Sequence, residues 1–113
     1  MDRIRASLTH PHSFPESEAV VRLARLFEVI RGMFPAYNLA HEWSNEARTA
    51  ATFRFTREEK GHGSGKAVLA AGKLEVEIDA QYKLPWLVPV VVAEKLVRDE
   101  FRKAVEKAFH SPT

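Results

Sequence analysis

Hydrophobic and polar residues alternate along several short segments, most regularly at residues 73–83. A period of two is typical of a strand with one buried face and one face in water. Shorter segments with the same pattern predict strands at 3–9, 37–43, 51–56 and 66–72. In the 73–83 segment the positions expected to face the core are Leu74, Val76, Ile78, Ala80 and Tyr82.

Two other segments repeat with the period of an α-helix. Ser13 and Glu16 form a capping-box pattern before the first, and Gly32 is expected to end that helix near Met33. The second is expected to run to about Phe109. The core-facing positions are Val20, Leu23, Phe27 and Ile30 in the first helix, and Val90, Ala93, Val97, Phe101, Ala104 and Ala108 in the second.

The predicted order of elements is β-α-β-β-β-β-α. The strands are polar on one face, which favours a single antiparallel sheet of about five strands with two helices packed on its other face. This is the α+β order of helix-grip and TATA-binding-protein-like folds, and it fixes no function. Without a linker or repeat, we expect residues 1–113 to form a single domain, with an ordered core at 3–109 and a tail at 110–113.

The composition narrows the possible functions. The chain has 17 lysines and arginines and 15 acidic residues, which gives a net charge of +2. The basic residues form no cluster in the sequence, so we expect no binding to nucleic acid. The chain has no cysteine, which excludes disulfides and thiolate catalysis. Residues 1–5 lack the apolar region of a secretory signal, and the longest apolar stretch, at 84–93, is too short to span a bilayer. We therefore expect a cytoplasmic protein.

His10 and His12 are the first candidates for reactive chemistry. Two positions apart on an extended chain, they point the same way and could begin a metal site, but no third ligand follows at a recognised spacing. The preferred interpretation is a stiff join between strand and helix. We expect no metal, no cofactor and no catalytic residue, and hence no enzyme.

The segment "GHGSGK" at 61–66 resembles a phosphate-binding loop only superficially. A P-loop has the spacing G-x-x-x-x-G-K followed by Ser or Thr, whereas here the glycines are one residue too close and Ala67 follows the lysine. We interpret 57–65 as a polar, glycine-rich hairpin loop.

The most unusual segment is "YKLPWLVPVVVAEKL" at 82–96. Its alternation stops at Leu84 and an apolar run follows. One interpretation is a buried connector. The other is an exposed surface that contacts a partner or a hydrophobic surface, and its candidate contact residues are Trp86, Leu87, Val88 and Val91.

Several segments together resemble the polyhydroxyalkanoic acid system family, also described as polyhydroxyalkanoate granule-associated or granule-regulatory proteins. They are "HPHSFPESEAVVRLARLF", "FRF", "GSGKAVL", "KLEVEIDAQYKLPWL" and "FRKAVEKAF", within residues 3–109. The resemblance implies a bacterial cytoplasmic protein of storage-polyester metabolism with no known catalytic residue. A polyester granule is hydrophobic, so such a role would suit an apolar surface around Trp86.

Two other functions remain open. The first is a helix-grip domain that binds a small molecule or lipid between the long helix and the curved sheet, in a pocket lined by Phe53, Leu69, Ile78 and Phe101. The second is a homo-oligomeric module that associates through segment 84–92 or through a free strand edge.

Overall fold

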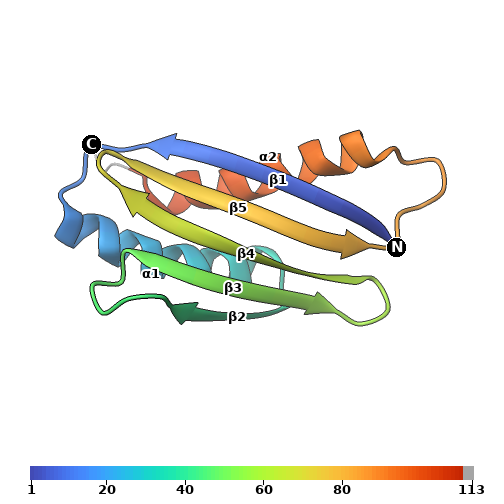
Figure 1. Cartoon of the computed structure of the whole chain (residues 1–113), viewed down its shortest axis with the longest axis horizontal. Coiled ribbons are helices and arrows are strands. Elements are labelled where there is room, and N and C mark those ends of the chain that lie inside the picture. Colours follow the sequence, from blue (N-terminus) through green and yellow to red (C-terminus); the bar gives the residue numbers. More distant parts are fainter. Residues whose placement is uncertain (111–113) are drawn as a thin grey trace.

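The computed structural model describes residues 1–110, which form five strands and two helices (Figure 1). The elements follow the predicted order. Their bounds are β1 Asp2–Pro11, α1 Glu16–Met33, β2 Asn38–Trp43, β3 Ala50–Arg57, β4 Gly61–Ala70, β5 Lys73–Tyr82 and α2 Val90–Ala108. Residues 111–113 of the predicted tail lie outside the described residues.

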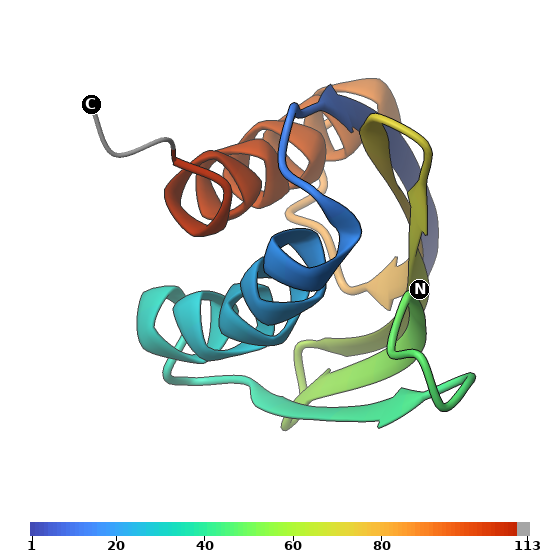
Figure 2. The same cartoon turned by 90° about the vertical axis from the view of Figure 1, so that its left-hand side faces the viewer.

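All five strands belong to one antiparallel sheet, in the order β1-β5-β4-β3-β2. The first strand pairs with the last, from Asp2 opposite Tyr82 to Pro11 opposite Lys73. The sheet is curved, and both helices lie against its concave side (Figure 2). The predicted α+β fold is therefore confirmed.

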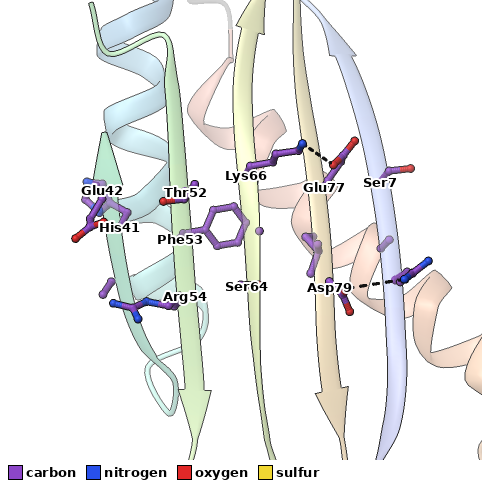
Figure 3. A pocket seen from close by; sticks show the side chains of 15 residues that line it. Ser7, His41, Glu42, Thr52, Phe53, Arg54, Ser64, Lys66, Glu77 and Asp79 are labelled. Carbon is purple, nitrogen blue, oxygen red and sulfur yellow. Dashed lines mark ion pairs between the residues drawn. The ribbon is translucent and has the colours of Figure 1, made fainter. Parts of the chain in front are cut away.

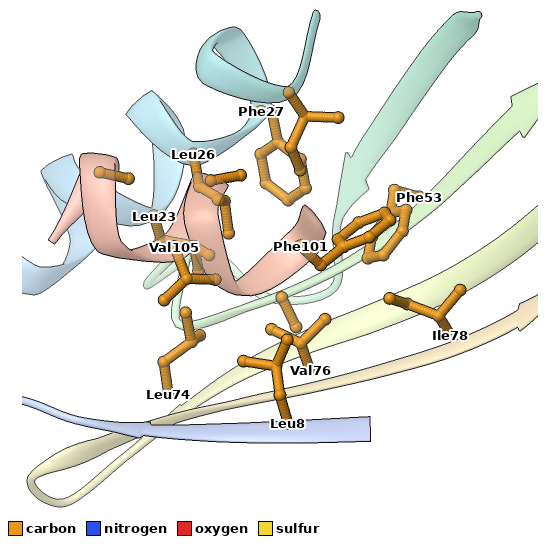
Figure 4. Close-up of a cluster of buried hydrophobic side chains, with 14 of the residues drawn as sticks. Leu8, Leu23, Leu26, Phe27, Phe53, Leu74, Val76, Ile78, Phe101 and Val105 are labelled. Atoms are coloured by element: carbon orange, nitrogen blue, oxygen red, sulfur yellow. The ribbon is translucent and has the colours of Figure 1, made fainter. Parts of the chain in front are cut away.

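The core lies between the helices and the concave face of the sheet (Figure 4). The alternation in β5 is confirmed, because its odd-numbered side chains are more exposed than the buried ones between them. Each fully buried Leu, Ile, Val or Phe contributes about 1.5–3 kcal/mol to stability. The central side chains are Leu8, Leu23, Leu26, Phe27, Phe53, Leu74, Val76, Ile78, Phe101 and Val105.

The glycine-rich segment is a strand, and the predicted loop at 57–65 is wrong beyond residue 60. Gly63 pairs with Phe55 and Gly65 pairs with Phe53. A Cβ atom at either glycine would overlap the paired phenyl ring. The missing side chains of these glycines leave room for two phenyl rings to lie across β4. The sequence pattern does not reveal this packing, because glycines at this spacing are also typical of a turn.

The start of α1 also differs from the prediction. Pro15 is the N-cap residue, and no side chain in the described part of the chain caps the helix, so the predicted Ser13 cap is wrong. Ser13 is exposed; the backbone N–H of Phe14 instead donates to His12 Nδ1 at 3.2 Å. The end of the helix at Met33 is as predicted.

A helix side chain contacts the backbone at each outer strand of the sheet. At β1, the N–H of Arg5 donates to the Glu94 carboxylate of α2 at 2.9 Å. At β2, Arg31 of α1 donates through Nε to the Leu39 carbonyl at 3.4 Å. These contacts occupy one backbone group on each edge of the sheet.

Candidate functional site

An apolar pocket of about 380 Å³ lies where the end of α1, the first half of α2 and the concave face of the sheet meet. The connector between β5 and α2 closes one side of it. Its lining residues are Ile4, Ile30, Phe34, Tyr37, Leu39, Phe55, Tyr82, Leu84, Pro85, Val88, Ala93, Leu96, Val97, Glu100 and Phe101. The volume is near the lower end of the range of small-molecule sites.

Only three lining residues carry a polar side chain: Tyr37, Tyr82 and Glu100. Burial raises the pKa of the Tyr82 phenol, and the neighbouring Tyr37 adds to the rise, so this phenol stays neutral. Glu100 forms an ion pair with Lys103 at 2.9 Å. The lining contains no Lys, Arg or His, so it suits an uncharged, mostly apolar molecule better than an anion.

The predicted pocket residues are only partly correct. Phe101 lines the apolar pocket. Phe53 and Ile78 instead fill the closed core, and Leu69 pairs with Leu74 at the other end of the β4–β5 hairpin. Sequence reasoning missed Tyr37, Tyr82 and the end of α1, because they come together only when the sheet curves around the helices.

The residues proposed for hydrophobic contact have two different environments. Trp86 is 90% exposed, Leu87 is 71% exposed and Val91 is 69% exposed. The interpretation of a fully buried connector is therefore wrong. Val88, in contrast, is half-buried, packs against the core and lines the pocket.

A second, polar hollow of about 830 Å³ lies on the face of the sheet turned away from the helices (Figure 3). Its charges are largely paired across strands: Lys66 contacts Glu77 at 3.3 Å, and Asp79 forms a two-point contact with Arg3. The Arg3 contact lowers the pKa of Asp79 and keeps the carboxylate charged. Alternating signs on an open surface favour solvation of this face over ligand binding.

His10 and His12 lie at the end of α2, where both imidazoles approach the Phe109 ring, at centroid distances of 6.1 Å and 5.5 Å. Burial, and secondly the charge of His10, lowers the pKa of His12. Among residues 1–110, His12 Nε2 is buried and has no hydrogen-bond partner. Within residues 1–110, no three histidine or acidic side chains form a group that could hold a metal ion.

No protein-family model and no curated protein sequence matches this chain significantly. Solved structures do match. A crystal structure of Ara h 8.0201 aligns with 98% of this chain and 100% of its own, with a TM-score of 0.57 and 14% sequence identity. At this identity the likeness shows the fold alone, which is the helix-grip fold.

Two further crystal structures align with lower scores. They are the Zhui aromatase/cyclase from Streptomyces sp. R1128, with a TM-score of 0.46 over 95% of this chain and 87% of its own, and DR_A0006 from Deinococcus radiodurans, with a TM-score of 0.43 over 92% and 96%. Their identities are 14% and 13%. Within residues 1–110, neither helix is long and apolar enough to cross a membrane.

Proposed function

We propose that this protein binds a small, uncharged, apolar molecule in the pocket between α2 and the sheet. The observation that carries the proposal is the pocket itself: about 380 Å³ of space with an almost entirely apolar lining, in a helix-grip fold whose core is otherwise closed. Apolar pockets with a few convergent polar groups are the commonest form of small-molecule site.

The lining also limits the class of ligand. The two phenols, Tyr37 and Tyr82, provide hydrogen bonds for one hydroxyl or carbonyl group, while Glu100 would repel a carboxylate. A neutral ligand of one or two rings, or a short aliphatic chain with one oxygen, fits both the volume and the chemistry. The proposed role is binding without catalysis, because all but three of the lining side chains are apolar.

Titration with N-phenyl-1-naphthylamine, a neutral fluorescent probe of apolar sites, tests the proposal. Val97 lines the pocket from α2 and is half-buried, so Val97→Phe should fill the space and weaken probe binding at least about tenfold. Val21→Phe is the matched control, because Val21 is an exposed valine on α1. Equal probe affinities for the wild type and Val97→Phe would refute the proposal.

A second candidate function is association with polyhydroxyalkanoate granules in a bacterial cytoplasm. The resemblance noted in the sequence supports it, and so does the exposure of Trp86, Leu87 and Val91 on one segment. In Trp43→Phe protein, Trp86 is the only tryptophan. Its emission should shift to the blue on titration with polyester particles, and an unchanged spectrum would count against granule contact.

A further inference from the structure

Five exposed apolar side chains gather on the connector and the first two turns of α2. Segment 83–89 leaves the sheet at the end of β5 and loops out at one end of the molecule before α2 begins (Figure 1). Pro85 and Pro89 bracket its centre and stiffen it. We call the exposed residues the apolar tip; they are Trp86, Leu87, Val91, Val92 and Leu96, with exposed fractions between 45% and 90%.

The apolar tip continues directly into the lining of the pocket. Leu84, Pro85 and Val88, which flank Trp86 and Leu87 in the chain, all line the pocket. Leu96 belongs to both, because it lines the pocket and is 57% exposed. The exposed apolar surface of the tip is therefore continuous with the apolar lining of the pocket through Leu96 and the connector.

Lysines surround the apolar tip. The carbonyl of Lys60, in the turn between β3 and β4, accepts a hydrogen bond from the N–H of Lys83 at 2.9 Å, so these two residues lie side by side next to Leu84. Lys95 lies on α2 between the exposed valines and Leu96. In residues 1–110 none of these three lysines takes part in an ion pair.

Acidic side chains also lie near the tip, and two of them are in ion pairs. Glu94 accepts from the backbone of β1, and Asp99 and Glu100 form ion pairs within α2. Glu58 and Glu59, in the same turn as Lys60, are the opposing charges. Arg57 at the start of that turn and Arg98 on α2 add two basic side chains, so residues 57–60, 83–89 and 90–98 hold five basic and three acidic side chains. The tip therefore combines an exposed indole, aliphatic side chains and a small excess of positive charge.

We propose that the apolar tip docks the protein onto an anionic phospholipid surface, from which the pocket takes up or to which it delivers its apolar ligand. The transfer step rests on the function proposed above; the docking step does not. Tryptophan favours the boundary between lipid headgroups and acyl chains, and lysine stems extend along apolar surface while their ammonium groups reach phosphate. An uncharged polyester surface would use the apolar side chains but not the lysines.

Flotation of the full chain with lipid vesicles tests docking. Binding should be strong to vesicles of phosphatidylcholine with 30% phosphatidylglycerol and weak to pure phosphatidylcholine. The double variant Trp86→Ser with Leu87→Ser should lose binding at least about tenfold, since both side chains are exposed and neither supports the core. Val21→Ser, an exposed valine far along α1 from the tip, should bind like the wild type.

A charge variant tests the lipid class. Lys83→Gln with Lys95→Gln should weaken binding to anionic vesicles about thirtyfold and leave binding to neutral vesicles unchanged. Equal flotation of the wild type and the Trp86/Leu87 variant would overturn the proposal. So would equal binding to neutral vesicles, equal binding to uncharged polyester particles, or a stable dimer in light scattering that the Trp86/Leu87 variant converts to monomer.

A pocket variant separates this proposal from the function it extends. Val97→Phe should still float with anionic vesicles while it no longer takes up N-phenyl-1-naphthylamine from them. The Trp86/Leu87 variant should bind the probe from water but extract it slowly from vesicles. If Val97→Phe binds the probe normally but the Trp86/Leu87 variant fails to float, the pocket function fails and docking stands.

Discussion

At the scale of single residues, the clearest dependence of the fold on residue type is at Gly63 and Gly65. Each lies opposite a phenylalanine on β3, and each leaves the space in which that ring lies. Gly32, near the end of α1, has open space where a Cβ would stand. Glycines of the same chain therefore differ in whether a methyl group can be added.

We predict that Gly63→Ala destabilises the protein by about 1–3 kcal/mol, because the added methyl group overlaps the Phe55 ring and lies too close to the Ala80 Cβ. Gly32→Ala is the matched control and should stabilise it by up to about 1 kcal/mol, because alanine is the better helix former. Urea unfolding followed by circular dichroism measures both. If Gly63→Ala is as stable as the wild type, the Phe55 ring has more free space above β4 than the structure shows.

At the scale of elements, Arg22 joins the two helices. It lies on α1, is only 7% exposed, and its guanidinium donates to the carbonyls of Ala108 and His110 at the end of α2. Glu18, one turn earlier, pairs with it at 3.0 Å, and the Phe14 ring lies 4.3 Å from its central carbon. The Arg22 side chain thus donates hydrogen bonds to carbonyls at the end of α2, where a helix has no further N–H groups of its own to donate.

We predict that Arg22→Lys lowers stability by about 1–3 kcal/mol, although the charge is kept. A lysine has no planar group to stack on Phe14 and cannot reach both carbonyls in the same way. Arg25→Lys, exposed on the same helix, should change stability by less than about 0.5 kcal/mol. Equal effects of the two substitutions in chemical denaturation would contradict the role given to Arg22.

The elements also show how far the sequence alone could be interpreted. The alternation in β5 and Gly32 near the end of α1 act locally, so the bounds of β5 and the end of α1 were predicted nearly to the residue. Strand β4 was missed at its start because its inward positions are glycines, whose missing side chains are replaced by rings from another strand. The contacts of Arg22 and the lining of the pocket could not be predicted either, because the residues that form them lie far apart in the chain.

At the scale of the whole molecule, two histidines link folding to pH. His41 stacks on Phe27 at a centroid distance of 4.2 Å, and its Nδ1 accepts from Arg31 at 2.9 Å. Burial and, secondly, the Arg31 charge lower the pKa of His41, against a small opposing effect of Glu28. Burial also lowers the pKa of His12. Both imidazoles are therefore neutral in the folded protein at pH values where the unfolded chain begins to bind protons.

We predict that stability is greatest above about pH 6.5, the ordinary pKa of histidine, and falls as the pH drops toward 5.5. In that pH range His12 and His41 bind protons in the unfolded chain but stay neutral in the folded protein. Urea midpoints between pH 7.5 and 5.5 measure the slope. His41→Gln should flatten it, whereas His62→Gln, exposed on β4, should leave it unchanged. A protein that becomes more stable on acidification over this range would contradict the prediction.

The contacts of Glu94 and Arg31 with the two outer strands have a consequence for the path to fibrils. A second chain that adds a strand at β1 or β2 needs the backbone groups that these side chains already hold. Cross-chain pairing at those points therefore requires that the Glu94 or Arg31 side chain first move away from the strand. We therefore expect Glu94→Ala, which frees the Arg5 N–H, to raise the rate of fibril growth from the folded protein.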